Sequence, residues 1–179
     1  MGNTGWRRWL PGFLGACVSA AILLVASPSG HAVGARTVHL LLAAGKPGDP
    51  PEFNFGGYSH GALSLTVPVG ARLVVRFVNA GTIPHSLLVL PRTGAQPPIP
   101  ATAPAFPGAS TEHPDLGLAP GREETLSFEA SRAGTYEFLC GVPGHALAGM
   151  WDTLVVSPDV ATPLVAPVGA EKAIEFSVR

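Results

Sequence analysis

The sequence reads Tyr136-Glu-Phe-Leu-Cys140-Gly-Val-Pro-Gly-His145-Ala-Leu-Ala-Gly-Met150-Trp151, and in this stretch a thiol, an imidazole and a thioether recur at intervals of five residues. An interval of five matches neither the period of a strand nor that of a helix. The residues between them include three glycines and a proline, namely Gly141, Pro143, Gly144 and Gly149. We therefore expect Cys140 to end one strand, Trp151 to open the next, and the three side chains to converge on a curled loop.

Short runs of alternating apolar and polar residues surround this loop, each bounded by Gly, Pro, Asn or Asp. They cover residues 37–42, 62–67, 72–79, 86–90, 125–130, 135–140 and 153–156. The chain is 46% hydrophobic and only 13% charged, with 22 glycines and 19 prolines, which argues against a disordered chain and against a helical bundle. Regular strand and turn signals of this kind predict an all-β fold, a two-sheet Greek-key β-sandwich.

Two segments interrupt this rhythm. Residues 91–121 hold eight prolines in 31 residues, so they cannot form a central strand, and they form a long Pro-rich insertion. Phe106 and the following Pro-Gly pair favour an ordered cover over one end of the sandwich, and a loose surface insertion is the alternative. Residues 158–179 form a C-terminal extension with a proline-containing linker and a predicted strand at 173–178.

Residues 1–35 have the pattern of an export segment. Arg7 and Arg8 precede an apolar stretch over residues 13–26, and small residues with Pro28 follow it. This pattern predicts a signal peptide or, alternatively, an N-terminal membrane anchor. The folded domain then begins near Arg36 and extends to residue 157, and we expect an extracytoplasmic location, periplasmic or at the cell surface.

The donor types in the loop indicate a copper site. A soft thiolate and thioether beside an imidazole suit copper, with Cys140 and His145 as strong ligands and Met150 as a weak axial one. His85 is the candidate for the remaining position, because Pro84 fixes its approach to the next strand. Each residue alone has an ordinary role in a core or on a surface. Beyond residue 35, however, the only cysteine and the only methionine flank a histidine in a glycine-rich loop.

Other function classes find little support. The net charge of −1 leaves no basic surface for nucleic acid. His39, His60 and His113 show no metal-ligand spacing, and we expect all three on the surface. Neither a catalytic triad order nor a phosphate-binding loop is recognisable, so we expect no enzymatic activity.

Over about residues 50–157 the sequence resembles the cupredoxins, and within them the sulfocyanins and the related rusticyanins. The resemblance rests on the Cys-x4-His-x4-Met loop, on Ile-Pro-His-Ser-Leu-Leu at 83–88, and on Phe-Asn-Phe-Gly-Gly at 53–57 with Gly-Ala-Leu-Ser-Leu-Thr-Val-Pro at 61–68. Ser86 stands where many cupredoxins have Asn. The extension beyond Ser157 departs from the family pattern.

The resemblance implies that residues 36–157 form a cupredoxin domain with one type 1 copper ion held by His85, Cys140, His145 and Met150. It further implies a blue copper protein that shuttles one electron in an extracytoplasmic or respiratory chain. Redox partner proteins, cytochromes or a terminal oxidase, are then expected to dock near His145 on a monomer. The alternative is a non-redox copper-binding protein, a chaperone or a storage protein, and the intense visible band of copper(II) bound to thiolate separates the two.

Overall fold

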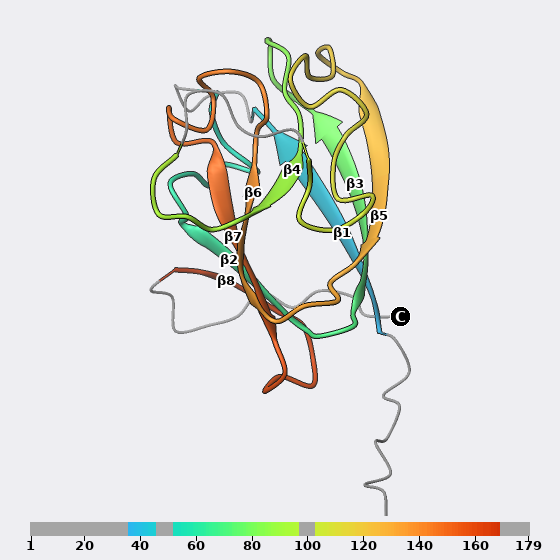
Figure 1. The fold of residues 1–179 in the computed structure, drawn as a ribbon. Coiled ribbons are helices and arrows are strands. Elements are labelled where there is room, and N and C mark those ends of the chain that lie inside the picture. The colour runs from blue at the N-terminus through green and yellow to red at the C-terminus, as the bar shows by residue number, and fades with distance from the viewer. Residues whose placement is uncertain (1–35, 46–51, 97–102, 169–179) are drawn as a thin grey trace, which may run out of the picture. The chain divides into compact units, whose positions relative to one another are not determined.

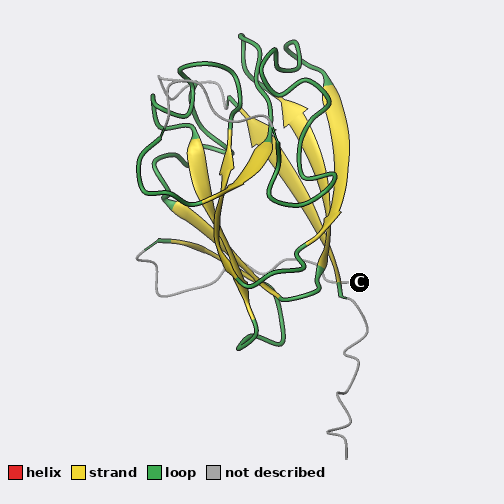
Figure 2. Cartoon of the chain, in the orientation of Figure 1, coloured by secondary structure: helices red, strands yellow, loops and turns green. Residues whose placement is uncertain are grey.

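The computed structural model of the protein describes residues 36–45, 52–96 and 103–168 (Figure 1). Strands and loops make up these residues, with no helix among them (Figure 2). The strands are β1 (Thr37–Ala44), β2 (Leu63–Pro68), β3 (Arg72–Asn79), β4 (Leu88–Pro91), β5 (Glu123–Glu129), β6 (Gly134–Leu139), β7 (Trp151–Ser157) and β8 (Leu164–Pro167). Within the described ranges, no helix is long and apolar enough to cross a membrane.

The strands form two sheets. One has the order β1-β3-β5, and the other has the order β4-β6-β7-β2-β8. Both sheets are mixed, because β1 runs parallel to β3 and β2 runs parallel to β7, whereas the other pairs are antiparallel. The first six strands alternate between the sheets, so neighbours within a sheet are mostly not consecutive along the chain, as in Greek-key sandwiches. The predicted all-β sandwich is confirmed.

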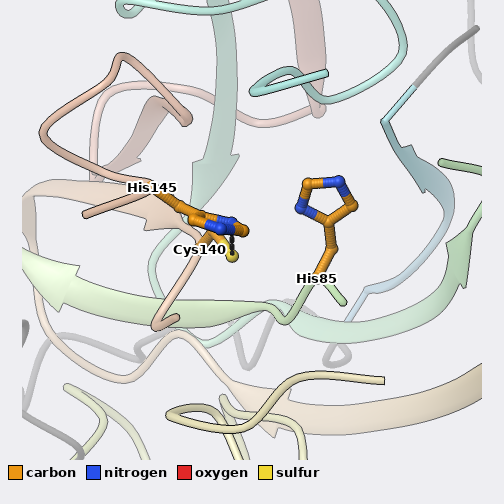
Figure 3. Close-up of side chains that lie close together, drawn as sticks. All are labelled: His85, Cys140 and His145. Atoms are coloured by element: carbon orange, nitrogen blue, oxygen red, sulfur yellow. Dashed lines mark hydrogen bonds between the residues drawn. The ribbon is translucent and has the colours of Figure 1, made fainter. Parts of the chain in front are cut away.

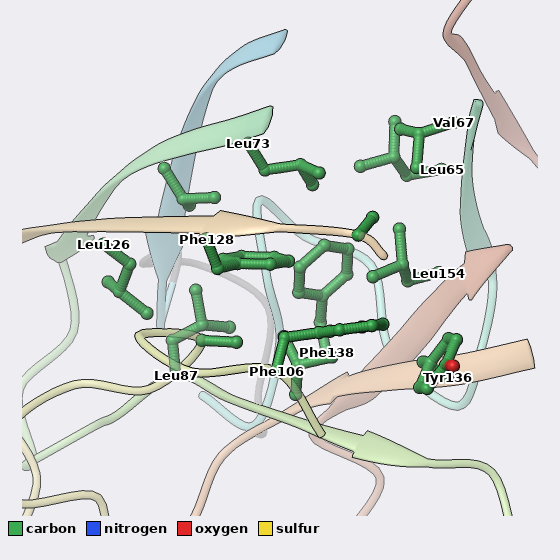
Figure 4. Close-up of a cluster of buried hydrophobic side chains, with 14 of the residues drawn as sticks. Leu65, Val67, Leu73, Leu87, Phe106, Leu126, Phe128, Tyr136, Phe138 and Leu154 are labelled. Atoms are coloured by element: carbon green, nitrogen blue, oxygen red, sulfur yellow. The ribbon is translucent and has the colours of Figure 1, made fainter. Parts of the chain in front are cut away.

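The core lies between the two sheets, where one face of each sheet is apolar (Figure 4). On β3, Leu73, Val75 and Phe77 are fully buried, while Arg72 and Arg76 of the same strand are exposed. This alternation is the period of two that the sequence shows, since successive side chains of a strand point to opposite faces. The large sheet contributes Leu65, Val67, Leu154 and Val156 to the core from β2 and β7.

The C-terminal sheet edge differs from the sequence prediction. β8 pairs antiparallel with β2, although the sequence analysis assigned its residues to a linker. Pro163 precedes this strand and Pro167 ends it, and proline is tolerated at a sheet edge because one side of the strand needs no hydrogen bonds. The predicted strand at residues 173–178 and the export segment 1–35 lie outside the described residues.

The described part of the Pro-rich insertion is tied to the sandwich. Backbone hydrogen bonds join Ala105 and Ala109 to Val89, and Thr111 to Leu87. Phe106 is fully buried, stacks on Phe128 of β5 with ring centroids 5.8 Å apart, and lies 4.7 Å from the ring of Tyr136. The insertion thus covers the residues that lead from His85 into β4.

Candidate metal centre

The loop from Cys140 to Met150 is held at both ends by a strand pair. Cys140 directly follows β6, Met150 directly precedes β7, and the last pair of the two strands is Leu139 with Trp151. The Cys140 N–H also donates to the Met150 carbonyl at 3.1 Å. The loop is therefore closed at its base, which sets the separation of the first and last candidate ligands.

Turns inside the loop bring its middle back toward its base. The His145 N–H donates to the Val142 carbonyl at 3.1 Å, and the Met150 N–H donates to the His145 carbonyl at 3.0 Å. Gly149 adopts φ +103°, a backbone conformation that residues with a side chain rarely take. The sequence prediction of a curled loop between two strands is what the structure shows.

His85 reaches the loop from another part of the chain. It precedes β4, which pairs antiparallel with β6, and the first pair of these strands is Leu88 with Leu139. An isolated bridge to Leu118 of the insertion holds the His85 backbone, with hydrogen bonds of 2.7 and 3.2 Å. Strand pairing thus places His85 beside Cys140, 55 positions further along the chain.

Three candidate ligand atoms converge in the structure (Figure 3). One ligand atom from each of His85, Cys140 and His145 lies within 4.8 Å of the other two. The Cys140 Sγ and His145 Nδ1 atoms are 3.4 Å apart, and the two imidazole centroids are 5.2 Å apart. No other group of three such side chains within metal-binding reach occurs among the described residues.

Burial keeps the three groups in their neutral forms when no metal is bound. His85 is fully buried, and neither of its ring nitrogens has a hydrogen-bond partner within the described part of the chain. Burial, and next the neighbouring His145, lower the pKa of His85 to about 4, so its ring is a neutral electron-pair donor. Burial also lowers the pKa of His145 and raises the pKa of the Cys140 thiol. A metal ion would use these lone pairs and favour the thiolate.

Ser86 supports the cysteine. Its N–H donates to Cys140 Sγ at 3.3 Å, and its hydroxyl accepts from the Gly141 N–H at 2.8 Å and donates to the Pro114 carbonyl at 2.7 Å. Donation to sulfur favours the thiolate form that a metal requires. The serine therefore fixes the position of Cys140 and links it to the insertion.

Met150 lies in the same buried region as Cys140. Its side chain is fully buried and belongs to the hydrophobic cluster that contains Cys140. Its place before β7 is set by the two backbone hydrogen bonds of residue 150 to Cys140 and His145. The other histidines of the described ranges, His39, His60 and His113, are exposed, as predicted.

The sequence analysis did not recognise that the segment from Glu52 to Gly61 contacts the site. The Phe53 ring lies against the His145 ring with centroids 4.8 Å apart. The His60 N–H donates to the Gly149 carbonyl and the Gly61 N–H to the Trp151 carbonyl, each at 2.8 Å, so this segment holds both neighbours of Met150. His60 adopts φ +56°, which is uncommon for a residue other than glycine. The Phe-Asn-Phe-Gly-Gly motif at 53–57 was the available signal.

Comparisons with known proteins agree with this geometry. The model of the sulfocyanin (SoxE) domain matches residues 28–166. Sulfocyanin of Sulfolobus acidocaldarius is 32% identical over 134 residues, which cover 72% of this chain and 67% of that protein. Rusticyanin of Acidithiobacillus ferrooxidans is 30% identical over 128 residues, which cover 68% of this chain and 64% of that protein, just under two thirds of its length.

A solved structure of reduced rusticyanin is similar to this fold with a TM-score of 0.55 and 28% sequence identity, and the match covers 68% of this chain and 79% of that one. A two-sheet sandwich that gathers two histidines and a cysteine at one end is the architecture of the cupredoxins, the blue copper electron-transfer proteins. The chain belongs to the sulfocyanin family, and its site fits one type 1 copper ion.

Proposed function

We propose that this protein is a one-electron carrier in an extracytoplasmic or respiratory chain, and that His85, Cys140, His145 and Met150 hold its copper. The observation that carries the proposal is the convergence of three buried or half-buried donors with no hydrogen-bond partner for either nitrogen of His85. When bound, copper supplies one-electron exchange between its +2 and +1 states. A donor set of two imidazoles and a thiolate with a long thioether is typical of electron-transfer copper sites.

The surrounding chain supports a site that changes little between the two oxidation states. Cys140 is held by strand pairing and by Ser86, and His85 is held by the bridge to Leu118. Because the backbone on both sides is fixed by hydrogen bonds, the ligand atoms cannot move far on electron transfer. Small movement favours rapid exchange.

We place the docking surface for redox partners around His145. His85 and Cys140 are fully buried, whereas His145 is only half-buried, so it provides the shortest route to the surface. The adjacent Leu147 side chain is 60% exposed, and Leu116 of the insertion is 66% exposed. Exposed apolar side chains near a redox site suit brief docking of a partner protein.

The proposed location is outside the cytoplasm, with the chain secreted or attached through residues 1–35. The arginines followed by an apolar run in the sequence support this assignment. Fractionation of the producing cells tests it. A processed protein released with the soluble extracytoplasmic contents indicates a cleaved signal, a full-length protein in washed membranes indicates an anchor, and intact protein in the cytoplasm contradicts both.

Copper loading tests the electron-transfer assignment. The chain is titrated with copper(II), and its visible spectrum is recorded before and after addition of a one-electron reductant. We expect an intense blue band that disappears on reduction and returns on oxidation. A copper complex that is colourless, or that cannot be cycled, would support the non-redox alternative of a chaperone or storage protein.

A further inference from the structure

The second ring nitrogen of His85 has no role in the site described so far. Figure 3 shows one nitrogen of His85 facing Cys140 and His145 and the other pointing away from them. Nε2 lies against two glycines, since a Cβ atom added to Gly45 or to Gly81 would come within 2.8 or 3.1 Å of it. A side chain at Gly45 would clash with the imidazole and with the Gly81 backbone, whereas a methyl group at Gly81 fits if its neighbours give way by a few tenths of an ångström.

A carboxylate borders the same space. A Cβ atom added to Gly81 would lie 3.1 Å from Nε2 and also 3.0 Å from Glu52 Oε2, so Glu52 borders the same space beside Gly81. Thr82 holds this carboxylate in place, because its hydroxyl donates to Oε1 at 2.6 Å and its N–H donates to Oε2 at 2.8 Å. Glu52 is half-buried, and the Ile83 backbone N–H also acts on it; each carboxylate oxygen can accept more than one hydrogen bond.

A histidine that binds a metal through one nitrogen carries a proton on the other and usually donates it to a carboxylate, a carbonyl or a water. The Nε2 atom of His85 is buried and has no such acceptor among the hydrogen bonds of the described residues. An unpaired N–H at this depth is unfavourable. Glu52 is the carboxylate at hand.

We propose that Glu52 is a positioning residue of the copper site: its carboxylate accepts the outer N–H of His85, directly or through one water, and its charge stabilises copper(II) over copper(I). The inference rests on the proposed function. Independently of hydrogen bonding, the negative charge of Glu52 acts on the ring and raises the pKa of His85 against the larger effect of burial. The glycines at positions 45 and 81 leave the approach between ring and carboxylate open.

The roles of the charge and of the hydrogen bond are separable by substitution. Glu52→Gln keeps an acceptor oxygen and removes the charge. Gly81→Ala keeps the charge and inserts a methyl group between the carboxylate and Nε2, at a position whose backbone is compatible with alanine. Glu129→Gln is the matched control, because it removes an exposed carboxylate at the other end of the β3 and β5 pair, where Glu129 is paired with Arg72.

Two measurements on the copper-loaded proteins test the proposal. The first is the ratio of copper(II) to copper(I) at a fixed solution potential. We expect Glu52→Gln to lower this ratio about threefold to tenfold, as removal of a nearby, partly screened charge does, and Gly81→Ala to change it less. The second is the exchange of the His85 ring N–H with solvent in the diamagnetic copper(I) protein, followed by NMR on ¹⁵N-labelled histidine. We expect Gly81→Ala to speed this exchange about tenfold or more.

The outcomes are distinct. The role of Glu52 is overturned if Glu52→Gln and Glu129→Gln have the same copper(II) to copper(I) ratio and Gly81→Ala leaves the N–H exchange unchanged. If the wild-type protein is blue, the proposed function stays intact in that case. A wild-type protein without the blue band overturns the proposed function and, with it, the role of Glu52. A purely structural role for Glu52 predicts lower stability of Glu52→Gln with an unchanged copper ratio, which also contradicts the proposal.

Discussion

The two histidines of the site are held in different ways. His85 is fully buried, and residues from before β2, from the end of β3 and from the Pro-rich insertion enclose it. His145 is half-buried on a loop that is closed by its own turns, and Cys140, Phe53 and His85 are its side-chain neighbours. The difference shows how one small site combines a fixed, solvent-protected candidate ligand with a candidate ligand that reaches the surface.

The largest effect is expected at Cys140, the third candidate ligand beside the two histidines. Cys140→Ser removes the thiolate that supplies the visible band and the strongest bond, so the blue colour should vanish. Copper affinity should fall by more than the roughly 10- to 100-fold typical of losing an outer-shell contact. Spectroscopy and a copper-binding titration measure both. A Cys140→Ser protein that stays blue rules out the type 1 site.

Removing each histidine in turn tests the comparison directly. His145→Gly should open the copper to added imidazole, which restores the blue colour from solution. His85→Gly should respond at least about tenfold more weakly at equal imidazole concentration, because the protein covers that side. Equal rescue of the two variants would show that burial in the structure does not control access to the metal.

Phe53 should decide how firmly His145 is held. Phe53→Ala removes a partly buried ring from the face of the imidazole, at a cost of about 1–2 kcal/mol, less than for a fully buried phenylalanine. Added imidazole should then compete with His145 for copper in a protein that retains all its ligands. Phe53→Leu serves as the control that keeps an apolar contact, and unchanged stability and ligand access in Phe53→Ala would remove Phe53 from this role.

Met150 should tune the site without being needed to form it. Met150→Gln replaces a soft sulfur by a harder oxygen donor, which favours copper(II), so the ratio of copper(II) to copper(I) at a fixed potential should rise about tenfold. Redox titration measures this ratio, and the blue band should persist. An unchanged or lower ratio would exclude Met150 as the axial ligand.

The smallest effect on the copper itself is expected at the surface next to His145. Leu147→Lys places a charge on the proposed docking surface, so electron self-exchange should slow about threefold to tenfold through like-charge repulsion. The visible spectrum and the potential should stay as in wild type. NMR line broadening of mixed copper(I) and copper(II) samples reports the rate, and Leu41→Lys on exposed β1 is the control for an equal change in charge. An undiminished rate in Leu147→Lys places docking elsewhere.

The sequence by itself determined the strand class and the candidate ligand set. Alternation of apolar and polar residues is a local property, and it identified seven strands, with β3 correct at both ends. The spacing of Cys140, His145 and Met150 is also local, because the glycine-rich loop that carries them is closed by two adjacent strands. For this reason the loop could be predicted from the residues in it.

Only the tertiary structure decided which distant segments meet. The bridge from His85 to Leu118 and the contact of Phe53 with His145 join residues separated by tens of positions, and no local pattern encodes them. β8 was missed because prolines at its borders resemble a linker until the free edge of β2 is known. Glu52 in the sequence is one carboxylate among 12 acidic residues, and its place beside His85 follows from the close approach of Gly45 and Gly81. Such contacts depend on how the two sheets pack, and packing is a property of the whole chain.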